Sequence, residues 1–245
     1  KRIENLMSKY KPESEISKLN HLGKLKVSSD TYYVLKKAGE FWRLSDGAFD
    51  ITTGPLLDLW GFTHKRYRMP SAEKIKNTLS LVGFDKIIFN DTDETVKFKI
   101  QGMEIDLGGI AKGYAVDCAI KKLKEKGISS CLINAGGQIY CLGDNFGKPW
   151  NVAIKNPRGN SVVDYLKLKN RSAATSGDYE QYFIKAKQRY SHIFNPKTGY
   201  PADSDIVAVT VVAQDGLTAD ALSTSIFVLG KTRGQELAKK FPAVK

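Results

Sequence analysis

The segment at residues 106–113, DLGGIAKG, constrains the fold of this 245-residue chain more than any other stretch. A strand-like run ends at Ile105 and a helix-like run begins at Ala111, so the glycines form the connection between them. Adjacent glycines let backbone amides approach a ligand closely, and the N-terminus of the following helix favours negative charge. Lys112 adds one positive charge. The segment therefore predicts either a phosphate-binding loop or simply a tight connection between a strand and a helix.

A carboxylate and a hydroxyl lie four residues apart further along the chain, in Asp220 and Thr224. On a helix this spacing places both side chains on one face. Mg²⁺ prefers oxygen ligands and takes few of them from the protein when a phosphate is present. The alternative is an acidic residue facing a helix dipole and a threonine packed in an apolar helix. The glycine-rich segment matches neither the P-loop nor the GxGxxG spacing. Together with this pair it still predicts chemistry on a nucleotide diphosphate.

His192 is the one histidine whose surroundings suggest chemistry. It lies between a strand-like run and the turn-forming residues 195–199, NPKTG. A histidine near its ordinary pKa can take a proton from a hydroxyl nucleophile, or it can stabilise the turn by bonding to the backbone. The local sequence leaves both interpretations open. His21 and His64 have no such setting and are expected to be surface or loop residues.

Three further segments combine glycines with polar or aromatic residues. Residues 134–137, NAGG, are expected to end a buried strand, where backbone could meet a ligand. Residues 176–180, SGDYE, follow another strand and offer a hydroxyl, a carboxylate and an aromatic ring. The stretch 47–62 is expected to be irregular, and its aromatic residues could stack on a flat ring or fill the core.

Length and composition fit one continuous globular domain without repeats or linkers. No apolar run reaches the roughly 18–20 residues of a membrane helix, and no signal peptide is visible. The net charge of +12 favours anionic partners such as a nucleotide, although lysine-rich helix faces are the simpler explanation, and no nucleic-acid module is visible. Cys118, Cys131 and Cys141 fit no zinc motif and are expected to be buried free thiols.

The hydrophobic pattern mixes helices and strands without regular βαβ alternation, which predicts an α+β fold with mostly antiparallel sheets packed with helices. After a first helix that ends near residue 9, residues 11–20 are expected to form a short polar turn. Helices are expected over 31–44, 71–82, 111–126, 218–229 and 232–240. A hairpin is expected within 86–105, and strands over 131–142, 150–154, 172–175, 182–184 and 206–212.

Taken together, these segments resemble one family, the FAD:protein FMN transferases, also called ApbE or flavin transferases. The resemblance runs from about residue 13 to about residue 229, and it is carried by the number and order of short segments. They are residues 14–20 (SEISKLN), 47–52 (GAFDIT), 54–56 (GPL), 59–62 (LWGF), 106–113, 134–137, 176–180, 192 with 195–199, and 219–224 (ADALST).

The resemblance implies a single ApbE-like, T-fold-like unit over residues 1–245 that lacks the outermost N- and C-terminal strands. It also implies a reaction in which FAD binds with its diphosphate beside Mg²⁺. A Thr or Ser hydroxyl of an acceptor protein attacks the FMN-side phosphorus, and AMP leaves. Water in place of the acceptor would make the protein an FAD pyrophosphatase. FAD retention without turnover would make it a non-enzymatic carrier.

By matching position, the resemblance assigns roles to individual residues. Asp220 and Thr224 would bind the metal together with the carbonyl of Gly109. Lys112 would neutralise the diphosphate, and His192 is the candidate base. Lys112, His192 and Asp220 are therefore the expected catalytic residues. The residues expected to bind FAD are Asn20, Thr52, Pro55, Trp60, Asp106, Gly108, Lys112, Asn134, Gly136, Ser176, Asp178, His192 and Thr198.

Two positions and the expected partners complete what the resemblance implies. Asn20 lies where the family contacts the flavin nucleotide and influences whether FAD is held or hydrolysed. Gln138 departs from the acidic residue or Asn that the family often has there. The acceptor would be a redox-pump or reductase subunit with a short motif of Asp, Gly and Ser or Thr, and no nucleic acid is expected. The expected location is the periplasmic side of the cell envelope, with possible tethering through a lipidated N-terminus, and the cytosol is the alternative.

Overall fold

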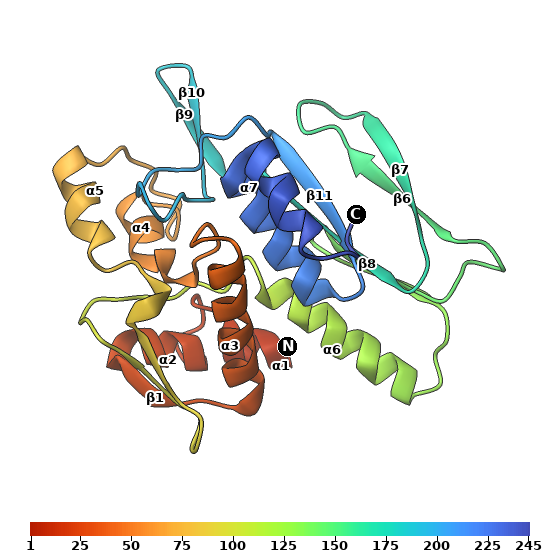
Figure 1. Cartoon of the computed structure of the whole chain (residues 1–245), viewed down its shortest axis with the longest axis horizontal. Coiled ribbons are helices and arrows are strands. Elements are labelled where there is room, and N and C mark those ends of the chain that lie inside the picture. Colours follow the sequence, from red (N-terminus) through yellow and green to blue (C-terminus); the bar gives the residue numbers. More distant parts are fainter. The chain divides into compact units, whose positions relative to one another are not determined.

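Helices and antiparallel sheets make up the structure, a computed structural model that describes residues 1–245 (Figure 1). This confirms the predicted α+β class. The contacts divide the chain into two units, of which the first is Lys1–Gly109 with Glu180–Asp203 and the second is Ile110–Tyr179 with Ser204–Lys245. The single domain expected over residues 1–245 stays a prediction. No helix combines the length and the apolar character that crossing a membrane would need.

The first unit contains five helices and two small sheets. Its helices are α1 (Arg2–Met7), α2 (Glu15–Leu22), α3 (Ser29–Leu44), α4 (Gly54–Leu59) and α5 (Ala72–Leu79), with 3-10 turns η1 (Ile51–Thr53) and η2 (Phe84–Lys86). One sheet has the order β1-β3-β2, with β1 (Lys24–Lys26), β2 (Ile87–Asn90) and β3 (Thr95–Phe98), and it includes the predicted hairpin. The other is the hairpin of β9 (Tyr182–Lys185) and β10 (Gln188–Ser191).

An aromatic cluster forms the core between α4, α5 and the β9–β10 hairpin. Trp60 is completely buried at its centre, and its indole N–H donates to the carbonyl of Gly199 at 3.1 Å. Aromatic rings surround it at centroid distances of 5.6 to 6.3 Å, namely Phe183, Tyr190, Phe194 and Tyr200. Burial of a large ring with its polar atom satisfied is strongly stabilising. The aromatic residues of the 47–62 stretch therefore serve the core here.

Two segments of the first unit are helical where the sequence predicted a turn or irregular structure. The turn expected over residues 11–20 is mostly helix α2, because Ser14 accepts from the backbone of Ser17 and begins a helix whose Ile16 and Leu19 are fully buried. The stretch 47–62, expected to be irregular, holds η1 and α4, since Pro55 stands in the first turn of a helix, where its missing N–H costs nothing.

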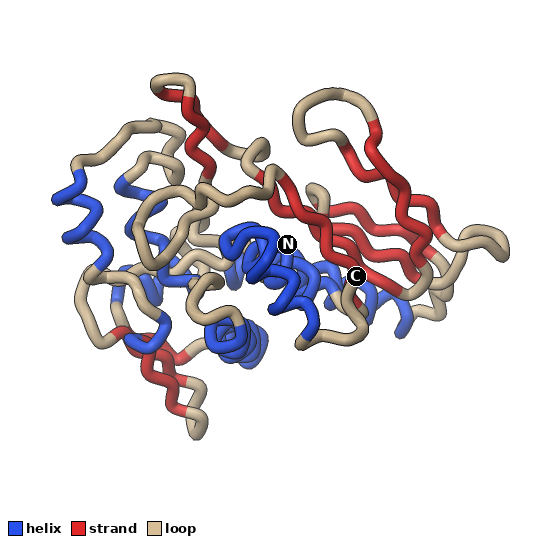
Figure 2. The backbone as a smooth tube through the Cα atoms, turned by 45° about the horizontal axis from the view of Figure 1, so that its top comes forward, coloured by secondary structure: helices blue, strands red, loops and turns tan.

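The second unit packs two helices on an antiparallel sheet of order β11-β8-β5-β4. Figure 2 shows these strands in red beside the blue helices. The strands are β4 (Cys131–Ala135), β5 (Gln138–Leu142), β8 (Arg171–Gly177) and β11 (Ala208–Ala213), and the helices are α6 (Ala111–Glu125) and α7 (Gly216–Lys239). A separate hairpin joins β6 (Trp150–Lys155) to β7 (Val162–Leu168). Strand β7 was not expected from the sequence.

Helix α7 contains both helices expected at the C-terminal end. Gly230 interrupts it with a φ of 77°, which lies in the left-handed region that favours glycine. The following amide, of Lys231, donates to Asp205 instead of to the preceding turn. The predicted pair of helices over 218–229 and 232–240 is therefore confirmed as the two halves of one kinked element.

Helices α6 and α7 meet through two glycines. A Cβ atom added to Gly113 would overlap the carbonyl group of Gly216, and one added to Gly216 would lie 2.5 Å from the carbonyl oxygen of Gly113. Only glycine at both positions lets the two backbones approach this closely. The contact sets how the start of α7 lies against the start of α6.

We expect Gly113→Ala to lower the free energy of unfolding by about 2–3 kcal/mol, because the added methyl must push α6 and α7 apart. Urea denaturation monitored by circular dichroism measures the change. Gly159→Ala is the control, since its added Cβ would meet only ordinary contacts with Asn156 from 3.5 Å, and we expect a change within about 0.5 kcal/mol. Equal effects of the two substitutions would contradict the close helix approach.

Candidate functional site

A buried carboxylate on α7 is the centre of the polar site in the second unit. Asp220 is 4% exposed, and its Oδ2 accepts from the backbone N–H of Gly113 at 3.0 Å. The Nζ of Lys112 lies 3.7 Å from Asp220 Oδ1, on a side chain that is half exposed. The structure thus brings together three residues from the two most informative sequence segments.

Burial raises the pKa of Asp220, and Lys112 and the Gly113 N–H act in the opposite direction without overcoming it. A raised pKa means that the neighbouring positive charge and N–H donor do not fully offset the cost of burying the charged carboxylate. A bound cation would supply the missing positive charge. The electrostatics of Asp220 therefore fit a metal ligand.

Hydroxyl groups line the same face of α7. Thr224 follows Asp220 by one turn, and its Oγ1 lies 3.3 Å from the Oγ of Ser176 on β8. Ser176 is also 2.9 Å from Ser223 Oγ, whose hydroxyl donates to the carbonyl of Asp220 at 2.9 Å. Carboxylate and hydroxyl oxygens are the hard donors that Mg²⁺ prefers, so this set fits that ion. Ser223 lies between Asp220 and Thr224 in the sequence, but its spacing alone did not indicate a role in the site.

Asp178 follows β8 and is held by a two-pronged ion pair. Both its oxygens lie 2.6 Å from nitrogens of the guanidinium of Arg158, which stands in the β6–β7 connection. Such bidentate pairs fix geometry as well as charge. Asp178 is thus oriented by a residue that no sequence motif indicated.

Asn134 lies near the end of β4 and Gly136 in the turn that joins β4 to β5, and both are exposed. Gly136 and Gly137 have φ values of 61° and 89°, and Asn134 Oδ1 accepts from the N–H of Gly137 at 3.0 Å. The glycines are therefore required by the hairpin turn itself. Their expected role in binding FAD stays a prediction.

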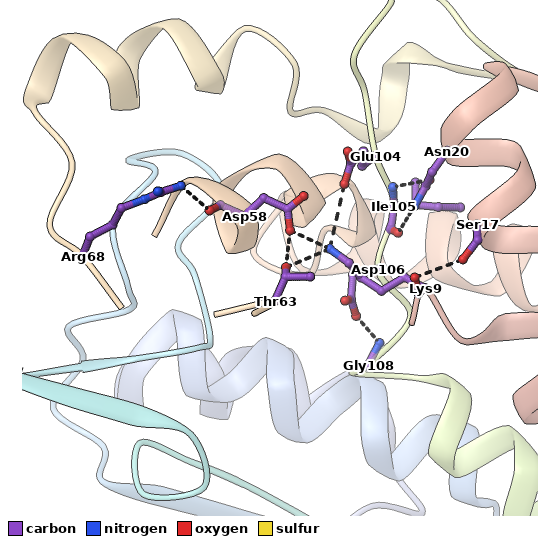
Figure 3. Close-up of polar contacts among 10 residues, drawn as sticks. All are labelled: Lys9, Ser17, Asn20, Asp58, Thr63, Arg68, Glu104, Ile105, Asp106 and Gly108. Atoms are coloured by element: carbon purple, nitrogen blue, oxygen red, sulfur yellow. Dashed lines mark hydrogen bonds and ion pairs between the residues drawn. The ribbon is translucent and has the colours of Figure 1, made fainter. Parts of the chain in front are cut away.

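The loop before α6 is tied to the rest of the first unit by its backbone (Figure 3). Both ends of the Asn20 amide bond to Ile105, with distances of 3.0 Å to its carbonyl and 2.9 Å from its N–H. Asp106 donates its N–H to the carbonyl of Ile51 at 2.7 Å and accepts from the N–H of Gly108 at 2.7 Å. The prediction of a strand that ends at Ile105 is wrong, because this segment bonds to Asn20 and Ile51 and not to a neighbouring strand.

Thr52 and Pro55 are buried in the same unit as Trp60. The hydroxyl of Thr52 donates to Asp50 at 2.6 Å and accepts from the N–H of Gly83 at 2.7 Å. These contacts favour structural roles for all three residues. Their expected contacts with FAD stay predictions.

A cluster of charged residues beside this loop was not indicated by any motif. The Nζ of Lys9 lies 3.2 Å from Asp58 Oδ1, 3.3 Å from Thr63 Oγ1 and 3.9 Å from Glu104 Oε2, as Figure 3 shows. The Lys9 side chain is only 6% exposed. The three charges come from segments far apart in the sequence, so only the fold could reveal them.

The two carboxyls around Lys9 titrate differently. Burial, reinforced by the charge of Asp58, raises the pKa of Glu104 to about 7. Burial would also raise the pKa of Asp58, but hydrogen bonding from Thr63 and the charge of Lys9 hold it below its ordinary value. Glu104, which lies two residues before the 106–113 segment, therefore exchanges its proton near neutral pH.

His192 follows β10 in the first unit. Its backbone N–H donates to the carbonyl of Gln181 at 3.0 Å, and its Nδ1 lies 3.2 Å from the same oxygen. A carbonyl oxygen only accepts, so Nδ1 carries a proton in this contact, and when the ring is neutral its lone pair is on Nε2. This tautomer is suited to accept a proton at Nε2. Thr198 lies in the nearby turn, where its hydroxyl accepts from the N–H of Tyr200 at 3.3 Å.

Comparison with known proteins shows that the chain belongs to the ApbE family, whose family model matches residues 1–245. A curated protein of Haemophilus influenzae named FAD:protein FMN transferase, an enzyme, is 36% identical over 96% of this chain and 71% of its own length. One from Vibrio cholerae with the same name is 35% identical, over 97% and 73%. The crystal structure of the ApbE protein from Thermotoga maritima matches with a TM-score of 0.92 and 42% identity, over 99% of this chain and 80% of that one. The flavin transferase ApbE from Vibrio cholerae matches with a TM-score of 0.88 and 33% identity, over 98% and 78%.

The raised pKa of Glu104 predicts a pH-dependent effect of Glu104→Gln. Glu104 binds its proton more tightly in the folded state, so its contribution to stability is complete below pH 4.5 and is lost as the pH rises through about 7. Relative to the wild type, the variant should gain on the order of 1 kcal/mol of unfolding free energy between pH 4.5 and pH 8, since partial exposure screens the effect. The pKa of Asp58 is lowered from 3.8, so its titration lies below the range from pH 4.5 to pH 8 and does not affect this comparison. Urea denaturation across the pH range measures the gain.

Glu125→Gln on α6 is the control, because Lys122 lowers the pKa of Glu125 below its ordinary 4.5, so its titration contributes no change in this pH range. If the free energy of unfolding changed with pH in the same way for the wild type and Glu104→Gln, Glu104 would not titrate near neutrality.

Proposed function

We propose that this protein transfers FMN from FAD to a Thr or Ser hydroxyl of an acceptor flavoprotein in a Mg²⁺-dependent reaction that releases AMP. The observation that carries the proposal is the buried Asp220 carboxylate, held by Gly113 and Lys112, with hydroxyl donors beside it. Membership of the ApbE family, with relatives named FAD:protein FMN transferase, supports the same chemistry.

Asp220 and Thr224 would hold Mg²⁺ through their side chains, and the family resemblance implies the carbonyl of Gly109 as a further ligand. When bound, Mg²⁺ neutralises charge on the diphosphate and on the leaving phosphate. Lys112 places a further positive charge beside Asp220, and its half-exposed side chain can contact a phosphate oxygen.

His192 would remove the proton from the acceptor hydroxyl. Its Nδ1 is held by the carbonyl of Gln181, which fixes the ring and leaves the lone pair on Nε2. The hydroxyl oxygen then forms a bond to the FMN-side phosphorus, and the bond from that phosphorus to the oxygen of AMP breaks. Positioning and charge neutralisation, rather than covalent catalysis by the protein, account for the rate.

The proposed acceptor and location rest on the family resemblance and not on contacts within this structure. We propose a redox-pump or reductase subunit as the acceptor, with a Ser or Thr in a short motif that also contains Asp and Gly. We propose a location at the periplasmic side of the cell envelope, with the cytosol as the alternative.

Asp220→Asn tests the metal role while keeping the shape of the side chain. The amide oxygen can still accept from the N–H of Gly113, so the fold should survive, but the charge that attracts Mg²⁺ is lost. We expect FMN transfer to fall at least about 100-fold at saturating FAD. AMP formation measured against Mg²⁺ concentration gives the result, and Asp203→Asn, outside both helices, is the control. Wild-type turnover in Asp220→Asn would rule out Asp220 as the metal ligand.

His192→Ala should slow FMN transfer by about 10²–10³-fold while leaving the affinity for FAD unchanged, because a general base acts on the acceptor and not on FAD binding. Flavin fluorescence gives the affinity, and AMP release gives the rate. His21→Ala, at the exposed end of α2, should change neither quantity. A large loss of FAD affinity in His192→Ala would instead make His192 a binding residue.

A further inference from the structure

Two carboxylates hold α6 and α7 together in a reciprocal way. Asp117 on α6 accepts from the N–H groups of Gly216 at 2.6 Å and Leu217 at 2.9 Å, the first two residues of α7. Asp220 on α7 accepts from the N–H of Gly113, near the start of α6. Each helix thus supplies one acid that binds the N-terminal backbone of the other.

The peptide group of Gly216 is fixed on both sides. Its N–H is held by Asp117, and its carbonyl oxygen lies 3.4 Å from the Nε2 of Gln138 on β5. Gln138 is itself buried and donates to Ser172 at 2.9 Å. The close approach of Gly113 and Gly216 leaves little room for the start of α7 to slide.

Asp220 stands one turn after Gly216 on the same helix, so the position of the helix start determines where the carboxylate lies. A metal ligand must be held within a few tenths of an ångström of its working position. The hydrogen bonds that Asp117 accepts therefore set the position of the Asp220 carboxylate through the helix, although Asp117 makes no hydrogen bond to Asp220 itself.

We propose that Asp117 is a positioning residue that holds Asp220 in place for the metal, an inference that rests on the proposed role of Asp220. Asp117 does not contact the substrate in this account. It fixes the two N–H groups that begin α7, and through the helix it fixes the ligand one turn later.

The test is Mn²⁺ binding followed by electron paramagnetic resonance in the presence of ADP, which carries the diphosphate and has no FMN to transfer. Asp117→Asn retains one acceptor oxygen but presents an amide N–H to the second backbone donor, so one of the two bonds is lost. We expect Mn²⁺ affinity to fall about tenfold, the lower end of the range for residues that support metal ligands.

Asp215→Asn is the matched control. Asp215 precedes the same helix and also makes two bonds, to the N–H of Thr218 at 2.8 Å and its hydroxyl at 3.0 Å, but both lie within α7. A role in helix capping alone predicts the same change in Mn²⁺ affinity for both variants, and that result would overturn the inference. The inference predicts a change within about twofold for Asp215→Asn.

Two further variants keep the outcomes distinct. Asp117→Glu retains the charge but displaces both acceptor oxygens, so it should also weaken Mn²⁺ binding, and wild-type affinity in a folded Glu variant would overturn the inference. If Asp220→Asn abolishes Mn²⁺ binding while Asp117→Asn binds normally, the metal site stands and the positioning role of Asp117 fails. If Asp220→Asn binds Mn²⁺ as the wild type does, the proposed metal role fails, and the inference about Asp117 fails with it.

Discussion

The hydrogen bond between the Asp220 carboxylate and the N–H of Gly113 is the interaction on which the candidate site depends. It joins α6 to α7 in a buried environment where an isolated carboxylate would be costly. The glycines at the crossing make the bond possible, since any side chain at Gly113 or Gly216 would separate the helices. A structural requirement for close packing and a chemical requirement for a buried oxygen ligand are therefore met by the same contact.

Within the first unit, the loop that leads toward Gly108 is held by its surroundings. Asn20 binds the backbone of Ile105 at both ends, and Asp106 is tied to Ile51 and Gly108. None of these bonds belongs to a helix or a sheet. Side chains distant in the sequence thus give a short extended segment the order that a strand ladder would otherwise provide.

How far the sequence predicts this protein differs between the fold and the site. Helices α3, α6 and α7 follow from the recurrence of apolar residues, because an amphipathic helix carries its own pattern. Helix α2 was expected to be a turn, because it is short and begins in polar residues, and its cap at Ser14 outweighs that composition. Asp220, Thr224 and Lys112 could be selected because they lie in glycine-rich or acidic segments. Their meeting at one place could not be derived from spacing.

Residues whose contacts join distant segments of the chain could not be recognised from the sequence around them. Lys9, Asp58 and Glu104 are ordinary charged residues in sequence, and only the structure brings Lys9 within 4 Å of both carboxyls. Asp117 lies in helix α6 outside every motif that the sequence offered, although it binds the start of α7. Contacts between distant segments depend on packing that a single sequence does not display.

Mass spectrometry of an acceptor peptide tests the central claim most directly. The peptide would contain Asp, Gly and a Thr acceptor, and would be incubated with the protein, FAD and Mg²⁺ while AMP is measured in parallel. The account predicts a mass gain of one FMN group on the peptide Thr with an equal amount of AMP. AMP formed without any modification of a panel of such peptides would contradict the transferase and identify a pyrophosphatase. FAD retained without AMP would contradict catalysis altogether.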